Sequence, residues 1–336
     1  MSGSVKPLAV TMGDPAGCGP QITVKAWQKR KELGLAPFFV LADPNLYSSE
    51  IPVAEISSAK DAMDVFDGAL PVMPIPLPGV KGLCVGKPNS DHAPAITASI
   101  SKATELCISG DAAAIVTNPI NKAVLYEAGF SFPGHTEYIA DLCSTEDRAI
   151  KPVMMLVGGG LRVALASIHV PLMRVLEHLT PDTLLETARI THAALIDRFG
   201  IKAPKLAFSG LNPHAGEDAT IGTEERDIIN PIASKLRDEG VDICDARPGD
   251  TVFHEALSGN FDAVIAMTHD QGLIPVKTLD MWGGVNTTLG LPIVRTSPDH
   301  GTAYDAAAAG NCRPDSLIAA LKLASEMAPA QEQTRV

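Results

Sequence analysis

Short apolar runs recur along the chain, and each is closed by glycine, proline, asparagine or aspartate. Runs of this length, rich in small aliphatic residues, are typical of strands that are buried on both faces of a sheet. Seven runs predict strands: Pro7–Thr11, Pro37–Leu41, Ala113–Thr117, Val153–Val157, Arg162–Ala166, Lys205–Ser209 and Ala263–Met267.

Amphipathic stretches with helical spacing lie between several of these runs. Thr180 and Pro181 are start signals for one helix, and Gly200 follows its end. The predicted helices are Gln21–Glu32, Ala95–Ser109, Pro181–Arg198, Glu224–Glu239 and Pro314–Glu326. Alternation of strands and helices predicts an α/β protein with mainly parallel sheets, and a chain of 336 residues predicts two lobes.

Two segments depart from this alternation. The stretch Ile51–Ser90 contains PVMPIPLPGVKGL, which is rich in proline and has no helical period, so we expect an extended surface segment or a linker. The polar tail after Met327 is expected to fray.

Charge and cysteine content narrow the class of protein. The formal net charge is -12, from 27 basic and 39 acidic residues, which argues against a nucleic-acid or anionic-membrane partner. An anionic substrate would therefore need a local cationic pocket. The sequence has no apolar run of 18 residues and no signal-peptide pattern, and its six cysteines form no CxxC pair. We expect a cytoplasmic protein with reduced thiols.

Three of the nine histidines share one context, because each follows a predicted buried strand by a few residues. They are His169, His214 and His269. Strand ends that are distant in sequence can converge in space, and three imidazoles with an open position form a catalytic zinc site or a site for a similar ion. From spacing alone, three unrelated loop histidines remain the alternative. Asp270 is a candidate to orient a histidine ligand.

Other polar groups also follow predicted strands. The glycine-rich segment Thr11–Pro20 is either a tight structural turn or an anion site at a helix N-terminus. His135 and Thr136, in a Pro-Gly turn, either bind a phosphate or carboxylate or simply begin a helix. Lys122 is either a site lysine or an exposed helix residue.

A last polar cluster lies near the C-terminus. Lys277 and Arg295 are cations of the kind that an anionic substrate needs, and Asn286 follows two glycines that allow close backbone approach. Asp250 either orients a substrate group or caps a helix.

Taken together, seven segments resemble the 4-hydroxythreonine-4-phosphate dehydrogenase family of pyridoxal phosphate biosynthesis. They run from near residue 10 to about residue 305: TMGDPAGCGP, TNPINKA, PGHTEY, GLNPHAGE, DTVFH, MTHDQGLIPVK and GVNTTLGLPIVRTSPDHGTA. Cys18, in AGCGP, stands where the family more usually has isoleucine.

The resemblance implies a fold similar to isocitrate and isopropylmalate dehydrogenases, with the active site in a cleft between two α/β lobes. We expect lobe 1 to comprise residues 1–130 and 300–336, and lobe 2 residues 131–299. The implied reaction is oxidation of 4-phosphohydroxy-L-threonine by NAD, or NADP, with decarboxylation to 3-amino-2-oxopropyl phosphate. Family members are homodimers whose active sites take residues from both subunits.

The resemblance also assigns residues. The metal ligands fall on His169, His214 and His269, with zinc as the expected divalent ion and magnesium or cobalt as alternatives. As a separate hypothesis of mechanism, either Lys277 or Asp250 is the base that accepts the hydroxyl proton. The implied substrate contacts fall on five positions: His135, Thr136, Lys277, Asn286 and Arg295.

Other activities remain open at this point. TMGDPAG and PINKA look closer to a family branch that acts on D-threonate or D-erythronate 4-phosphate, and another relative oxidises an unphosphorylated cyclic diol acid. Two further classes are a metal-independent acyl- or phosphotransferase and a non-catalytic small-molecule binding protein. A chelator would abolish NAD reduction only by the metal-dependent dehydrogenase.

Overall fold

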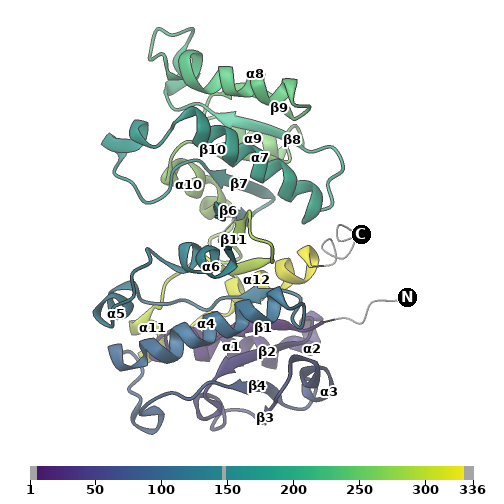
Figure 1. Ribbon diagram of the computed structural model, residues 1–336, viewed down its shortest axis with the longest axis vertical. Coiled ribbons are helices and arrows are strands. Elements are labelled where there is room, and N and C mark those ends of the chain that lie inside the picture. Colours follow the sequence, from purple (N-terminus) through teal and green to yellow (C-terminus); the bar gives the residue numbers. More distant parts are fainter. Residues whose placement is uncertain (1–5, 146–148, 329–336) are drawn as a thin grey trace. The chain divides into compact units, whose positions relative to one another are not determined.

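A computed structural model describes residues 6–145 and 149–328 of the chain (Figure 1). Nearly all of the tail that was expected to fray lies outside the described residues. The chain divides into two compact units: unit 1 comprises Met1–Pro152 and Leu291–Ala328, and unit 2 comprises Val153–Gly290. The lobe boundaries were expected near residues 130 and 300. In the structure, the chain passes from unit 1 to unit 2 after Pro152 and returns to unit 1 after Gly290.

Unit 1 contains a parallel sheet with the strand order β3-β4-β2-β1-β5-β12. Every residue of β1 and β2 is buried, as expected for strands covered on both faces. The strands are β1 (Leu8–Thr11), β2 (Phe38–Ala42), β3 (Val53–Glu55), β4 (Leu70–Pro74), β5 (Ile115–Val116) and β12 (Arg295–Pro298).

Helices cover this sheet. Helix α4 (Ala93–Ile108) packs on β1 and β2, and helix α12 (Asp315–Met327) packs on β12 and β5. The helices of unit 1 are α1 (Gly19–Gln28), α2 (Arg30–Leu33), α3 (Ala62–Val65), α4 (Ala93–Ile108), α5 (Lys122–Glu127), α6 (His135–Cys143), α11 (Tyr304–Ala308) and α12 (Asp315–Met327).

Unit 2 contains a mixed sheet with the strand order β11-β6-β7-β10-β8-β9. The pairs β11–β6 and β6–β7 are antiparallel, whereas β7, β10, β8 and β9 run parallel. The strands are β6 (Val153–Gly158), β7 (Leu161–Leu165), β8 (Lys205–Ser209), β9 (Asp242–Arg247), β10 (Ala263–Ala266) and β11 (Val285–Leu289).

Alternate side chains of β6 show that both faces of this sheet are covered. Met155 belongs to a core cluster that includes residues of α7 and α8, whereas Leu156 belongs to a second cluster with residues of α9 and α10. The helices of unit 2 are α7 (Pro181–Asp197), α8 (Asn230–Asp238), α9 (Val252–Leu257) and α10 (His269–Leu279).

The predicted α/β class is confirmed, and a strand forms within each of the seven predicted runs. The interpretation of Ile51–Ser90 as a possible linker is wrong, because Leu70–Pro74 forms β4 between β3 and β2. The helix predicted over Glu224–Glu239 begins as a π-helical turn, Glu225–Ile229, before α8. Pro231 lacks an N–H, which weakens regular helical bonding at this junction.

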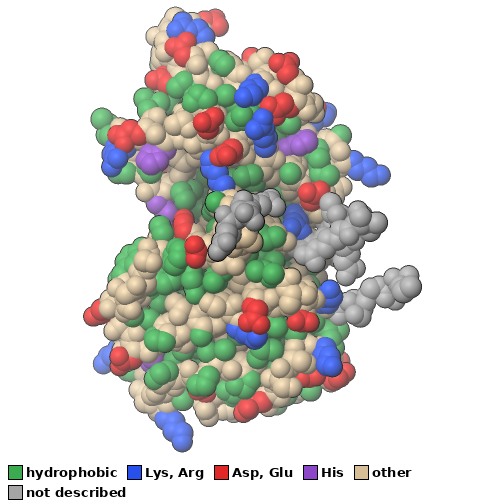
Figure 2. All heavy atoms as spheres, viewed as in Figure 1, with side chains coloured by type: hydrophobic (Ala, Val, Ile, Leu, Met, Phe, Trp, Pro, Cys, Tyr) green, Lys and Arg blue, Asp and Glu red, His purple; other side chains and the backbone are tan. Residues whose placement is uncertain are grey.

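The surface agrees with the charge analysis. Figure 2 shows acidic and basic side chains interspersed on the face drawn, rather than gathered into one broad cationic area. Among the described helices, none combines the length and the apolar character needed to cross a bilayer.

Candidate functional site

The three predicted metal ligands follow three neighbouring strands of unit 2. His169, His269 and His214 come after β7, β10 and β8 respectively, and these strands lie side by side and run parallel. Their carboxyl ends therefore open on the same edge of the sheet, which is where ligands gather in open α/β sheets.

Buried and partly buried hydrogen bonds join these strand ends to one another. The Ser167 hydroxyl donates to the Met267 carbonyl at 2.7 Å. Gln271, two residues after His269, accepts from the Ser209 hydroxyl at 2.6 Å and from the Met267 N–H at 2.8 Å. Its amide also donates to the Gly210 carbonyl at 2.7 Å. Sequence reasoning missed Gln271, whose only signal was its place between His269 and Gly272.

His169 and His269 lie next to each other, with ring centroids 5.6 Å apart. His269 is the first residue of α10, and its Nδ1 lies 2.8 Å from a carboxylate oxygen of Asp270. This contact orients the ring and leaves Nε2 for a ligand, an arrangement common among metal-binding histidines. The two neighbouring imidazoles fit two positions of one metal site.

His214 lies on an unusual turn. Its φ of 54° is left-handed, and Ala215, Glu217, Asp218 and Ala219 also have positive φ. Within the residues that the structure describes, no three His, Cys, Asp or Glu side chains group closely enough to hold a metal ion. The structure therefore brings together two of the three predicted ligands and places the third at a neighbouring strand end.

Arg295 and His135 are the two predicted substrate contacts of unit 1 that have buried polar atoms. Arg295 is 3% exposed on β12, and its Nε and Nη2 donate to the Thr117 hydroxyl at 3.2 and 2.8 Å. Burial lowers the pKa of Arg295 to about 10, while the Glu137 carboxylate acts in the opposite direction. The guanidinium therefore stays charged at neutral pH.

His135 begins α6 and is followed by Thr136. Burial holds the pKa of His135 well below its ordinary value, and the positive charges of Arg295 and Lys122 add to that effect. Its Nε2 is buried and has no hydrogen-bond partner among the described residues. Because an orphaned buried polar atom is rare, this nitrogen is suited to meet a ligand.

The remaining predicted residues lie elsewhere in unit 2. Lys277 follows His269 by eight residues on α10, which is about 12 Å of helix. Asn286 lies on β11 with a buried Oδ1 that has no partner among the described residues. Asp250 is exposed in the turn before α9.

The glycine-rich segment of unit 1 is a structural junction. A Cβ on Gly13 would lie 2.7 Å from the Asn118 Cβ, and Asp14 accepts from the Tyr304 hydroxyl at 2.6 Å. At the start of α1, the Cys18 N–H donates to the Thr302 carbonyl. The turn interpretation therefore describes this segment better than the anion site. Burial raises the pKa of the Cys18 thiol to about 12, so it stays protonated.

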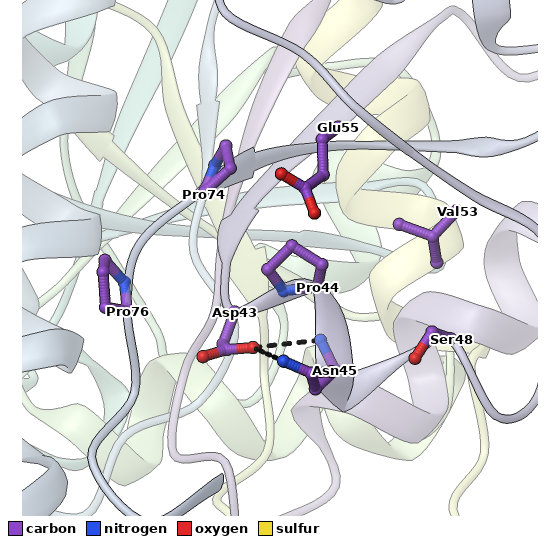
Figure 3. Close-up of a pocket in the computed structure, with 8 residues that line it drawn as sticks. All are labelled: Asp43, Pro44, Asn45, Ser48, Val53, Glu55, Pro74 and Pro76. Atoms are coloured by element: carbon purple, nitrogen blue, oxygen red, sulfur yellow. Dashed lines mark hydrogen bonds between the residues drawn. The ribbon is translucent and has the colours of Figure 1, made fainter.

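A surface cavity of about 340 Å³ opens in unit 1 near the ends of β2 and β4 (Figure 3). The Asp43 carboxylate in its wall accepts from the Asn45 N–H at 3.0 Å and from the Leu77 N–H at 3.1 Å, so both its oxygens are engaged. None of the predicted site residues lines this cavity, and it adds nothing to the candidate site.

Comparisons with known proteins agree with the motifs. A profile of the family described as pyridoxal phosphate biosynthetic protein PdxA matches residues 35–324. A protein of Methylorubrum extorquens named 4-hydroxythreonine-4-phosphate dehydrogenase is 51% identical over 337 residues, covering 98% of this chain and 96% of the relative.

Solved structures give the same result. A crystal structure of 4-hydroxythreonine-4-phosphate dehydrogenase from Klebsiella pneumoniae is 35% identical, with a TM-score of 0.86, covering 96% of this chain and 100% of that one. A terephthalate 1,2-cis-dihydrodiol dehydrogenase from Burkholderia xenovorans is 26% identical, with a TM-score of 0.66, covering 96% and 98%.

Proposed function

Because the chain belongs to the family described as pyridoxal phosphate biosynthetic protein PdxA, we propose that it is a dehydrogenase acting on a CH–OH group. Its proposed substrate is 4-phosphohydroxy-L-threonine. Hydride passes from the alcohol carbon to NAD or NADP, and the hydroxyl proton passes to a base. The resulting ketone loses carbon dioxide to leave an enolate, which takes up a proton at carbon to give 3-amino-2-oxopropyl phosphate. The near full-length identity of 51% to a relative of that name carries this proposal.

We assign the binding of a divalent metal to His169, His214 and His269. Zinc suits three imidazoles best, and magnesium and cobalt are the alternatives. When bound, the ion supplies Lewis acidity that lowers the pKa of a substrate hydroxyl. The neighbouring rings of His169 and His269 support the assignment, as does the position of His214 after the third of three adjacent strands.

His135, Thr136 and Arg295 are assigned to the anionic groups of the substrate. A neutral His135 can donate one hydrogen bond to a phosphate or carboxylate oxygen, and the charged Arg295 lies close enough to influence its pKa. The first N–H groups of α6 add a positive electrostatic potential beside Thr136. The burial of this region supports recognition of an anion, because low polarity strengthens charge interactions.

Lys277 and Asn286 complete the substrate contacts, and Lys277 or Asp250 accepts the hydroxyl proton. The resemblance to the family implies active sites that are shared between two subunits. We therefore propose a homodimer in which each active site takes residues from both copies.

Two substrate alternatives belong to the same chemistry: D-threonate or D-erythronate 4-phosphate, and an unphosphorylated diol acid. The greater likeness to 4-hydroxythreonine-4-phosphate dehydrogenase than to the dihydrodiol dehydrogenase favours a phosphorylated substrate. Initial rates of NADH formation with the four candidate substrates would rank them. A higher kcat/KM for the unphosphorylated acid would overturn the substrate assignment.

His214→Ala tests the metal assignment. We expect loss of zinc binding and of dehydrogenase activity with unchanged folding, since His214 is exposed. His178→Ala, at an exposed histidine of the same unit, is the matched control. Zinc content after dialysis and the rate of NADH formation are the measurements. Full zinc content and activity in His214→Ala would remove His214 from the site.

A further inference from the structure

The turn that carries His214 needs external support. Five of its six residues from 214 to 219 are not glycine and yet have positive φ, between 42° and 68°. Side chains with a Cβ avoid this region, so such a run persists only where the surrounding structure imposes it.

A buried carboxylate lies beneath this turn. Glu225 is 3% exposed, and one of its oxygens accepts from the N–H groups of Leu211 and Asn212 at 2.8 and 2.7 Å. The other oxygen accepts from the Asn212 side-chain amide at 2.9 Å. All three bonds are made to the two residues that precede Pro213 and His214.

The chain closes tightly around this carboxylate. A Cβ on Gly216 would lie 2.8 Å from the second Glu225 oxygen, and a Cβ on Gly222 would lie 2.5 Å from the Asn212 amide nitrogen. Glycine at these two positions lets the backbone approach the Glu225–Asn212 pair. The left-handed turn therefore lies directly against the hydrogen-bonded side chains of Glu225 and Asn212.

The same segment is tied to the strand end that carries His269. The Gly210 carbonyl accepts from the Gln271 amide, and Gln271 also binds the Met267 N–H, two residues before His269. Within the Gly210–His214 segment, Gln271 therefore bonds to the first residue, and Glu225 bonds to the next two.

We propose that Glu225 is a positioning residue for the metal: it fixes the backbone turn that directs His214 and thereby sets metal affinity without touching the ion. The inference rests on the proposed function, because it presumes that His214 is a ligand. It identifies an anchor that neither the histidine motif nor the family resemblance indicated.

The test compares Glu225→Gln with Asp227→Asn, a carboxylate-to-amide change at an exposed residue of the same π-helical turn. The glutamine carbonyl can still accept from the two backbone N–H groups. Its NH2 group, however, faces the Asn212 amide, which is itself a donor to both Glu224 and Glu225. The variant should therefore loosen the turn while leaving the backbone N–H groups bonded.

Zinc affinity is measured by competition with a chromophoric chelator, and the visible spectrum of the cobalt-loaded protein reports the ligand geometry. We expect Glu225→Gln to raise the zinc Kd by about 10- to 100-fold and to alter the cobalt spectrum. Asp227→Asn should leave both unchanged. A purely structural role would lower the melting temperature of the metal-free protein and leave the zinc Kd of the folded protein as in the wild type.

Two results would overturn the inference. One rejects only the role of Glu225, and the other also rejects His214 as a metal ligand. A zinc Kd for Glu225→Gln within about twofold of the wild type, while His214→Ala binds no zinc, rejects the anchor and keeps the metal site. Equal zinc binding by wild type and His214→Ala rejects both. If Glu225→Gln does not fold, Asn212→Ser replaces it, because it removes the side-chain amide that donates to Glu224 and Glu225 and keeps the Glu225 carboxylate. An unchanged zinc Kd in Asn212→Ser then rejects the anchor.

Discussion

Unit 1 buries the Arg295 guanidinium and the His135 nitrogen proposed to bind the substrate anion, whereas unit 2 exposes two of the three histidines proposed to bind the metal. In unit 1, Arg295 is buried against Thr117, and the free nitrogen of His135 is buried as well. In unit 2, His169 and His214 are exposed, and hydrogen-bonded side chains hold the backbone near them: Glu225, which is buried, and Gln271, which is half-buried. Burial sets the electrostatics of the proposed anion-binding residues, whereas hydrogen bonds set the backbone geometry of the proposed metal ligands.

Replacement of Arg295 in unit 1 should have the largest effect on activity. Arg295→Met should lower kcat/KM by roughly 100-fold or more, because it removes a buried cation proposed to bind the substrate anion. The melting temperature should fall only modestly, because methionine avoids the desolvation penalty of a buried charge but leaves the Thr117 hydroxyl without its Arg295 donors.

Steady-state kinetics and a thermal melt measure the two effects. Arg174→Met, at an exposed arginine of unit 2, is the control and should change neither. A large fall in melting temperature with normal kcat/KM would show that Arg295 serves folding rather than binding.

A smaller effect is expected on the pH dependence of stability, through His135 of unit 1. The pKa of His135 is depressed in the folded state, so the unfolded chain takes up the proton first as pH falls below about 6.5. The free energy of unfolding should therefore decline from pH 7.5 to 5.5, with His135 contributing about 1 kcal/mol of that loss.

Urea unfolding of the wild type and of His135→Asn at pH 7.5 and 5.5 isolates this contribution. The other histidines titrate in both proteins, and the decline should be shallower in the variant. Equal declines would mean that the His135 pKa is not depressed.

The smallest effect concerns the strained turn of unit 2. Ala219→Gly should raise the free energy of unfolding by about 0.5 to 1 kcal/mol, because Ala219 has a φ of 68° and glycine adopts this conformation without a Cβ clash. Ala193→Gly, at an exposed position inside α7, should lower it by about 1 kcal/mol. Urea unfolding curves compare them, and a destabilising Ala219→Gly would contradict the strain.

Each unit contains strands that could be predicted from the sequence and strands that could not. Runs such as Val153–Val157 were recognised because strands buried on both faces are apolar throughout. The strands β11 and β12 were missed because they bury polar residues, including Thr287, Thr296 and Arg295, and a hydropathy pattern does not report them.

His169, His214 and His269 could be identified from the sequence because each follows an apolar run that predicts a buried strand. Their anchors were not found, because a bond such as that from Gln271 to Gly210 joins residues 61 positions apart and leaves no local pattern. The left-handed turn at His214 was hidden for a related reason: its residues are ordinary ones that tertiary contacts force into an unfavourable conformation.

The discontinuity of unit 1 has a consequence for synthesis. Residues 153–290 form one continuous stretch, so unit 2 has its whole core once the ribosome has passed β11. Unit 1 lacks β12 and α12 until the last part of the chain emerges, although the buried strands β1 and β2 are made first. We therefore expect the N-terminal half to wait longest for its partners during translation, and it is there that a chaperone would find exposed apolar strands.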